Sequence, residues 1–478
     1  MIIKFFFSGV FLVLFISMNI ISVTAQTGNV GIDVNAPAEK LDVNGNIQLS
    51  GEIKINGAGG TAGQVLTSNG NGTMAWASQM SGGPATAGFG NWGDCATNQN
   101  IGDYFPVADN EGKANDRFGE ASAIDGYFAV ISSPGDDVGS NVDQGSLSVY
   151  QFDGTQWNFV QKLVDPAGEA NDYLGVSVAI SGNTIIAGIP EDDVASNVNQ
   201  GTAVIFRYDG ASWNYFQKIG QTPGFPGDKF GTSVTLINEY IICGVPYFDT
   251  NTSNNKGAVV IFKDDGAQYN QWQAITDVNL NNSAHFGSAV AINGDLELMI
   301  GVPWQNLTYN TQGAVHVYLF DGWIWNYSQT LIDPAGANGD TMGDFLACKN
   351  GIVIASQIGN QNDKGSAAIF SKNNSVYEFS QKITDPNGVG LDRFGQSVAI
   401  THEYALVGAA NANVSKGKAL LFVKVGSIWK VMQAISEPNA LQNTYFGMSV
   451  ALDSNTHRFL IGSNQVAGKG MAFFGKIN

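Results

Sequence analysis

The pair Phe118-Gly119 opens a unit that the chain repeats seven times. The same place in the later units is held by Leu174-Gly175, Phe230-Gly231, Phe286-Gly287, Met342-Gly343, Phe394-Gly395 and Phe446-Gly447. The steps between successive pairs are 56, 56, 56, 56, 52 and 52 residues. A fixed period of this size is typical of repeat architectures, in which each unit is one supersecondary structure that packs against the next.

Within the first unit, four short segments with strand character follow one another. We predict strands over Ser122–Ile124, Tyr127–Ile131, Ser146–Phe152 and Trp157–Leu163. The turn Asp153-Gly154 joins the last two, and Asp-Gly is a strong hairpin signal because both central residues of such a turn adopt positive φ. Four antiparallel strands in each of seven units predict an all-β fold, a seven-bladed β-propeller over residues 99–478.

The two ends of the repeat array predict how the ring closes. The seventh unit stops after its third strand, Met471–Phe474, and lacks a fourth. Ile101–Ala108 precedes Asp109, which matches Asp165 one period later, so this segment stands where a fourth strand belongs. We therefore expect an N-terminal strand to be donated to the last blade, because a closed ring leaves no exposed sheet edge.

The first residues have the composition of an export signal. Lys4 precedes an apolar run over Phe5–Ile16, and Val23-Thr24-Ala25 resembles a cleavage site. We interpret residues 1–25 as a signal peptide of a protein that is secreted or exposed on the cell surface, outside an outer membrane. Since the apolar stretch continues to about Val23, an uncleaved anchor is the alternative. No later segment approaches the roughly 20 apolar residues that a membrane span needs.

Residues 26–80 differ from the repeats and predict a small β-rich stalk. Stretches such as Gly28-Asn29-Val30-Gly31-Ile32 resemble the stalks of exported proteins of the Bacteroidetes, which are similar to phage tail-fibre segments. That resemblance implies a homotrimer, and strands this short need partner chains to bury a core. A semi-disordered spacer remains the alternative. Residues 81–98 are rich in Gly, Ala and Asn and are interpreted as a linker.

Composition excludes some partners. Of the 478 residues 44% are hydrophobic and only 13% are charged, and the net charge is −18. That sign argues against nucleic acid, whose phosphates are neutralised by Lys and Arg, and against docking on anionic lipid. Three cysteines, Cys95, Cys243 and Cys348, are too few for a disulfide scaffold. Cys243 and Cys348 lie in apolar runs and are expected in the core.

The units resemble FG-GAP repeats, the propeller repeats of the integrin α-subunit head. Besides the Phe-Gly pairs, the resemblance rests on a later apolar-Gly-x-Pro element and on third strands such as Gly201–Phe206. The element stands as Ala187-Gly188-Ile189-Pro190, Cys243-Gly244-Val245-Pro246 and Ile300-Gly301-Val302-Pro303. The resemblance implies a propeller and, less specifically, an extracellular role in cell adhesion.

The resemblance also implies calcium, but the sequence departs from the family there. Family repeats often carry Asp-x-Asp-x-Asp-Gly between the first two strands. Here the place is held by Ser181-Gly182-Asn183, Asn293-Gly294-Asp295 or Asp453-Ser454-Asn455, which offer too few oxygen ligands. We expect no cofactor from these loops.

Acidic loops are expected to gather on one face of the ring, where long loops on a rigid scaffold usually bind ligands. Two sets of loops share this face, those after the second strand and those after the fourth. The candidates for a metal site are the pairs Asp136-Asp137 and Asp192-Asp193, because adjacent carboxylates repel unless a cation offsets them. The alternative for each loop Asp is a turn former that bonds its own backbone.

Catalytic signals are weak. The histidines His285, His316, His402 and His457 fall at different repeat positions. Loops that repeat regularly from blade to blade disfavour a single asymmetric active site. Trp157, Trp213 and Trp325 are expected to pack inside the blades rather than to bind sugar. We therefore expect a non-enzymatic binding or adhesion protein that recognises an extracellular protein or a glycan. A carbohydrate-active lyase or hydrolase and a purely structural repeat protein are the alternatives.

Overall fold

The computed structural model describes residues 101–109, 111–249, 255–437, 442–465 and 468–477, and the backbone of six short strands before them. The chain divides into two compact units, Met1–Gly90 and Asn91–Asn478. The predicted signal peptide (1–25), the linker (81–98) and Cys95 lie outside the described residues. The short strands form three pairs, β1 (Val30–Ile32) with β2 (Leu41–Val43), β3 (Lys54–Ile55) with β4 (Ala58–Gly59), and β5 (Gln64–Ser68) with β6 (Met74–Ser78).

The second unit consists of seven four-stranded antiparallel sheets, as the repeats predict. Blades 1 and 2 are β8 (Ser122–Asp125), β9 (Phe128–Ser133), β10 (Ser146–Phe152), β11 (Trp157–Leu163), and β12 (Ser177–Ser181), β13 (Thr184–Ile189), β14 (Thr202–Tyr208), β15 (Trp213–Ile219). Blades 3 and 4 are β16 (Ser233–Ile237), β17 (Tyr240–Val245), β18 (Ala258–Asp264), β19 (Tyr269–Ile275), and β20 (Val290–Ile292), β21 (Glu297–Val302), β22 (Ala314–Phe320), β23 (Trp325–Leu331). Blades 5 and 6 are β24 (Leu346–Lys349), β25 (Ile352–Gln357), β26 (Ser366–Asn373), β27 (Val376–Ile383), and β28 (Ser397–Ile400), β29 (Tyr404–Ala409), β30 (Lys418–Val425), β31 (Ile428–Ile435).

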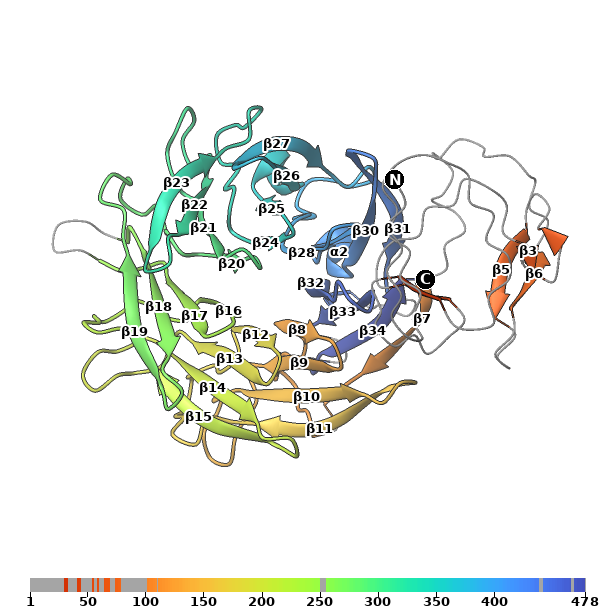
Figure 1. Cartoon of the computed structure of the whole chain (residues 1–478). Helices are drawn as coiled ribbons and strands as arrows, with labels where there is room; N and C mark the ends of the chain where they lie inside the picture. Colours follow the sequence, from red (N-terminus) through yellow and green to blue (C-terminus); the bar gives the residue numbers. More distant parts are fainter. Residues whose placement is uncertain are drawn as a thin grey trace, which may run out of the picture. The chain divides into compact units, whose positions relative to one another are not determined.

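The blades form a closed ring about a central axis. The first strand of each blade contacts the first strand of the next, and β32 of the last blade contacts β8 of the first. Figure 1 looks along this axis and shows the first strands innermost and the fourth strands on the rim. The fold is thus an all-β, seven-bladed propeller.

The last blade is assembled from both ends of the unit. It contains β32 (Phe446–Leu452), β33 (Arg458–Ser463), β34 (Met471–Ile477) and, as its fourth strand, β7 (Ile101–Val107). β7 runs antiparallel to β34, with Ile101 opposite Ile477 and Val107 opposite Ala472.

The Phe-Gly pair recurs because it joins neighbouring blades. Phe230 is fully buried and meets Phe262 edge to face, with ring centroids 5.9 Å apart. Gly231 has a φ of +86°, and a Cβ there would lie 2.5 Å from the carbonyl oxygen of Thr202 in the preceding blade. Only glycine fits such an approach of two backbones.

Glutamine side chains on the outer strands form a second junction between blades. The Gln161 amide accepts the N–H of Trp213 at 2.9 Å and donates to its carbonyl at 2.8 Å. The same two-point contact joins Gln217 to Tyr269, Gln273 to Trp325, Gln329 to Tyr377 and Gln381 to Trp429. It satisfies a backbone N–H and a carbonyl group at the edge of each outer strand, which would otherwise bond to water.

The Asp-Gly turns differ from the prediction. Four residues, Asp153 to Gln156, join β10 to β11, and Gly154 has positive φ while Asp153 does not. The Asp153 carboxylate accepts the N–H groups of Thr155 and Gln156 at 2.8 and 2.9 Å. The conserved element of these hairpins is therefore a side-chain cap on the turn rather than a pair of residues with positive φ.

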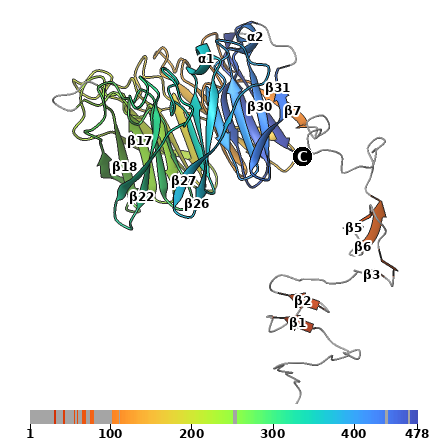
Figure 2. The same ribbon diagram turned by 90° about the horizontal axis from the view of Figure 1, so that it is seen from above.

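Two short helix-like turns interrupt the regular loops, α1 (Asn360–Asp363) in blade 5 and α2 (Ala412–Ser415) in blade 6, and both contain residues with left-handed φ, such as Asn362 and Asn413. Both lie in loops from second to third strand, and Figure 2 shows them at the same end of the strands. The sequence showed no helical periodicity there, since one turn is too short to produce it. Among the described residues, no helix has the length and apolarity that a bilayer crossing requires.

Candidate functional site

A cavity of about 620 Å³ opens on the loop face at the propeller axis. Its lining includes the residue that directly follows the Phe-Gly pair in six of the seven blades, namely Glu120, Val176, Thr232, Ser288, Asp344 and Met448. The seventh such residue, Gln396, contacts Met448 through its amide. The seven side chains are all different and all half-buried. A regular backbone therefore carries a ring of unlike side chains around the cavity.

The residue before each Phe-Gly pair is the second variable position. All seven have left-handed backbone conformations, with φ of 58° at Arg117, 55° at Tyr173, 59° at Lys229, 56° at His285, 53° at Thr341, 52° at Arg393 and 54° at Tyr445. Glycine would adopt this φ without steric cost, yet none of the seven is glycine. Left-handed conformations of larger residues are unfavourable and cluster at functional sites.

Three aromatic rings form one wall of the axial cavity. His285 stacks on Trp304 with ring centroids 4.3 Å apart, and the Tyr247 ring lies 4.7 Å from the His285 ring at a tilt of 50°. Tyr247 and Trp304 come from the second-to-third-strand loops of blades 3 and 4 and remain 38% and 43% exposed. Burial lowers the pKa of His285, so the wall is uncharged at neutral pH.

A carboxyl and a guanidinium also face this cavity. Burial raises the pKa of Asp344 to about 6, although the Thr341 hydroxyl and the Arg393 guanidinium both act to lower it. Asp344 thus exchanges a proton near neutral pH. The backbone N–H of Arg393 donates to the carbonyl of Asp363 at 2.8 Å, which joins the loops of blades 5 and 6 at the rim of the cavity.

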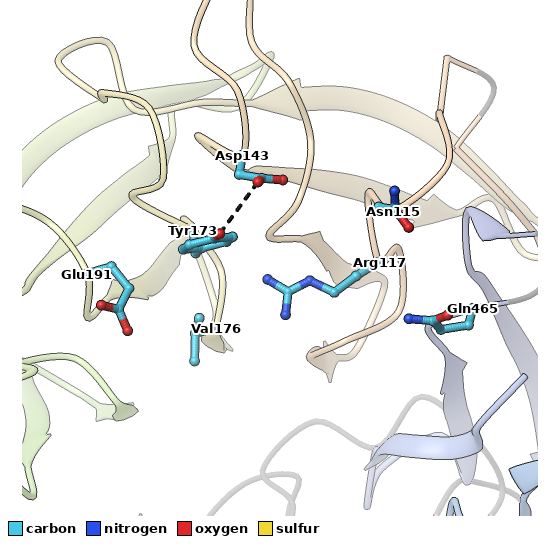
Figure 3. A pocket seen from close by; sticks show the side chains of 7 residues that line it. All are labelled: Asn115, Arg117, Asp143, Tyr173, Val176, Glu191 and Gln465. Carbon is cyan, nitrogen blue, oxygen red and sulfur yellow. Dashed lines mark hydrogen bonds between the residues drawn. The ribbon is translucent and has the colours of Figure 1, made fainter. Parts of the chain in front are cut away.

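A second cavity of about 420 Å³ adjoins the first through Val176, which lines both. Figure 3 shows the Arg117 side chain reaching into its centre, with Gln465 of the last blade on one side and Glu191 on the other. The Arg117 guanidinium lies 5.2 Å from the centroid of the Tyr173 ring. The Tyr173 hydroxyl donates to Asp143 at 3.4 Å.

The predicted metal pairs lie on the loop face, but their buried members already have cationic partners. Asp136 is 2.5 Å from the Lys162 ammonium and accepts from the Ser146 hydroxyl at 2.6 Å. Asp192 pairs with Lys218 and accepts from Thr202. These pairs explain how adjacent carboxylates are tolerated.

The outer members of the two pairs point elsewhere. Asp137 accepts the backbone N–H of Asp143 at 3.2 Å and lies 3.5 Å from the Lys113 ammonium. Asp193 accepts the N–H of Asn199 at 2.7 Å. Within the part of the chain that the structure describes, no three acidic, His or Cys side chains are arranged to hold a metal ion. The four aspartates therefore do not fit a calcium site.

The loops between first and second strands do not fit calcium either. Only Gly182 and Asn183 separate β12 from β13, which is too short for a family-type metal loop. In blade 4, Glu297 follows the equivalent turn, and its carboxylate contacts the Lys372 ammonium at 2.6 Å and the Tyr377 hydroxyl at 2.7 Å. An ammonium again stands where a metal ion would be needed to balance the charge.

Most other loop aspartates are turn formers, as the alternative interpretation held. Asp172 accepts the N–H of Glu169 at 2.6 Å, and Asp228 accepts that of Phe225 at 2.7 Å. Burial raises the pKa of both carboxyls to about 6. The N–H groups of Ala167, Ala335 and Asn387 are likewise accepted by Asp165, Asp333 and Asp385.

Other predicted residues are placed as follows. Trp213 and Trp325 are buried between blades, whereas Trp157 is half-buried and stacks on Phe474 at 4.4 Å. Cys243 is fully buried, but Cys348 is only half-buried at the edge of a core cluster, contrary to expectation.

His285 is the residue whose role the sequence reading missed. The four histidines fall at different repeat positions, which argues against a shared role for them. For His285, this difference between repeats is itself the signal that could have found it. Its position holds five different residue types in the seven units, while the glycine of the neighbouring pair is always kept. Loop regularity, which led us to disfavour a single asymmetric active site, does not extend to the side chains at the axis, because loop geometry repeats while these side chains do not.

Comparison with known families agrees with the fold. The FG-GAP repeat family matches residues 157–206 and 377–422, in blades 1 and 2 and in blades 5 and 6. The protein is thus a seven-bladed propeller that contains FG-GAP repeats. No curated protein matches the chain.

Two solved structures show similar architecture at low identity. The periplasmic gluconolactonase PpgL of Pseudomonas aeruginosa is 12% identical with a TM-score of 0.47, over 66% of this chain and 85% of that one. A protein of unknown function from Desulfotomaculum acetoxidans is 10% identical with a TM-score of 0.44, over 68% of this chain and 90% of that one. Neither likeness indicates what this chain binds.

Proposed function

We propose that this protein binds glycans without transforming them, in the axial cavity of its loop face, as a binding or adhesion protein of the cell exterior. The observation that carries the proposal is the wall of Tyr247, His285 and Trp304 beside hydrogen-bonding side chains. Ligand pockets typically combine apolar and aromatic walls with a few polar groups that fix orientation.

The two parts of the cavity suit the two kinds of surface on a sugar ring. The C–H face of a pyranose packs on the exposed part of Trp304, since an aromatic ring offers a flat apolar surface with few degrees of freedom to lose. Hydroxyls of the sugar would bond Thr232 and Ser288, which are half-buried and face the same space. The cavity volume of about 620 Å³ is typical of small-ligand sites.

Export and multivalency complete the proposal. A cleaved signal peptide over 1–25 would place the propeller outside the cell, and a trimeric stalk over 26–80 would present three propellers together. Weak single-site binding would then gain avidity, because the second and third contacts form at high effective concentration. A glycan on a cell or matrix surface would be engaged in this way, and a glycosylated extracellular protein is the corresponding protein partner.

A glycan array with the full mature chain tests the proposal. We expect retained glycans to be lost on Trp304→Ala. The matched control is Trp272→Ala, because Trp272 is also 43% exposed but lies on β19, an outer strand. Equal binding by the two variants, or no glycan bound by the parent chain, would refute the axial cavity as a glycan site.

A carbohydrate-active enzyme is the second candidate, favoured by one observation. Asp344, with its pKa near 6, shares the cavity with Arg393 and His285, and a carboxyl of that pKa is suited to general acid catalysis. Incubation of a bound glycan with the parent chain and with Asp344→Asn separates the two functions. Under the binding proposal neither protein releases new reducing ends, whereas an enzyme would release them only with Asp344 intact.

A further inference from the structure

We infer that Arg117 and Arg393 are anion contacts that select a carboxylate-bearing glycan for the axial site, an inference that rests on the proposed function. The chain has only four arginines, and two of them occupy the variable position before a Phe-Gly pair. The net charge of the whole chain is −18. The two arginines at this position are therefore not part of a protein that is cationic overall.

The other two arginines show what a structural arginine looks like in this fold. Arg207 lies 3.7 Å from the centroid of the Phe216 ring and pairs with Asp264. Arg458 lies 3.7 Å from the centroid of the Phe152 ring. Both guanidinium groups lie over aromatic rings of the blades.

Arg117 and Arg393 differ from these two because they line the two cavities. Among the described residues, neither guanidinium has a carboxylate oxygen within 4.0 Å. Arg393 is exposed, and Arg117 is half-buried and reaches into the smaller cavity. Figure 3 shows the Arg117 side chain among the residues that line this cavity, which include Val176 and Gln465. A planar guanidinium with free donors is suited to bidentate contact with a carboxylate.

The carboxylates that line the two cavities are largely held by other groups. Glu191 pairs with Lys229, and Glu120 accepts from the Asn464 amide at 2.5 Å. Asp143 accepts the Tyr173 hydroxyl. Asp344 and Asp363 complete the acidic lining of the axial cavity. The Arg393 guanidinium acts on the Asp344 carboxyl to lower its pKa, but among the described residues neither arginine forms an ion pair, so both keep N–H donors for a ligand.

The positions around the ring agree with one elongated ligand. Tyr247 and Trp304 belong to blades 3 and 4, while Arg393 precedes blade 6 and Arg117 precedes blade 1. In a ring of seven, the junction of blades 3 and 4 lies opposite blade 7, and the two arginines enclose blades 6 and 7. Because Val176 lines both cavities, a glycan that stacks on the aromatic wall can extend across the axis and place carboxylates at the arginines.

The test begins with the full mature chain on an array of neutral, uronic-acid-bearing and sulfated glycans. The inference predicts retention of uronic-acid glycans, and weaker binding of the same glycans after their carboxyls are reduced to alcohols. Retention of neutral glycans only, or of sulfated glycans in preference to uronates, overturns this inference and leaves the proposed function standing. If no glycan of any set binds, the proposed function fails as well.

Variants then assign the preference to the two arginines. By calorimetry with a retained uronate oligosaccharide, the double variant Arg117→Gln/Arg393→Gln should lose about 10- to 100-fold in affinity, as expected for charge-assisted hydrogen bonds. Its affinity for the carboxyl-reduced oligosaccharide should stay within about twofold of the parent. Trp304→Ala should weaken both ligands alike, which separates loss of the site from loss of its selectivity.

Two controls keep the result interpretable. Lys430→Gln removes a positive charge from the exposed face of β31 and should change neither affinity. Arg117→Lys/Arg393→Lys keeps the positive charges but loses the planar pair of N–H donors. Its affinity for the uronate should lie between those of the parent and of the glutamine variant. Melting temperatures equal to the parent establish that the variants are folded. A glutamine variant that keeps the parent's preference for the uronate overturns the inference.

Discussion

The junctions between blades and the cavity at the axis are built from the same repeat but obey opposite rules. At a junction the repeat keeps its residue types, as in Phe230-Gly231, because two backbones meet there and one chemistry fits. At the axis the flanking residues, such as Thr232, change in every unit. The difference teaches that, within one chain, repetition marks the scaffold, while the side chains around the axis are free to vary between repeats.

The largest effect should follow from breaking a junction. Gly231→Ala would place a Cβ 2.5 Å from the carbonyl oxygen of Thr202 at a φ of +86°. We expect a loss of about 3 kcal/mol or more in the free energy of unfolding, measured by urea denaturation. The control is Gly294→Ala, because a Cβ at Gly294 meets nothing within 4 Å. Equal stability of the two variants would contradict the close-approach explanation.

The next effect should come from the ion pairs beside the loop face. Lys218 contacts the Asp165 carboxylate at 2.8 Å and also pairs with Asp192, and both carboxylates are buried. Lys218→Met leaves two buried charges without a cation, so the free energy of unfolding should fall by about 3 kcal/mol. Lys430→Met on the exposed rim should change it by less than about 0.5 kcal/mol. Thermal melts of both variants would show whether this difference exists.

An effect of intermediate size should appear in the pH dependence of stability. The pKa of Asp172 and of Asp228 is raised to about 6 by burial, from 3.8 in the unfolded chain. Between pH 3.8 and pH 6 the folded state therefore binds more protons than the unfolded chain. The stability that these protons contribute is complete below pH 3.8 and is lost as the pH rises through 6.

Asparagine at both positions removes this titration. Asp172→Asn/Asp228→Asn should be more stable than the parent by about 1–3 kcal/mol at pH 7, and the gain should shrink towards pH 4. Urea midpoints at several pH values measure it. A constant difference across pH would show that the two carboxyls do not titrate as described.

A small effect is expected from substitution at the axis itself. Thr232→Val and Tyr247→Ala alter side chains that line the cavity rather than a junction. Their free energies of unfolding should stay within about 0.5 kcal/mol of the parent. A large loss in either variant would mean that the axial ring is part of the scaffold, and the contrast between the two regions would fail.

The smallest effect should be that of calcium. Because lysine ammonium groups pair with Asp136 and Asp192, added calcium should shift the melting temperature by less than the error of the measurement. A ligand that binds only the folded state raises that temperature in proportion to its occupancy. A shift of several degrees would restore the calcium prediction for these loops.

The sequence predicted the architecture well and the site poorly, for physical reasons that particular residues illustrate. The Phe-Gly period and the alternating strands are local patterns, so β10 and β11 begin and end where predicted. The ion pair of Lys162 with Asp136 could not be predicted, because it joins a strand to a loop 26 residues earlier in the chain through a long side chain. The convergence of Tyr247, His285 and Trp304 depends on how two blades meet, which the order of residues in one unit does not encode.

The exchange of strands in the last blade has a consequence for how the molecule forms. Ile101 pairs with Ile477, so six blades can assemble from neighbouring chain as it emerges, whereas the seventh waits for the final strand. Until then β33 and β7 would each present an open edge, and closing so long a loop carries a large entropic cost. Ring completion should thus be the slow, committed step of maturation, and a chain halted before residue 471 would expose strands prone to pairing with a neighbour.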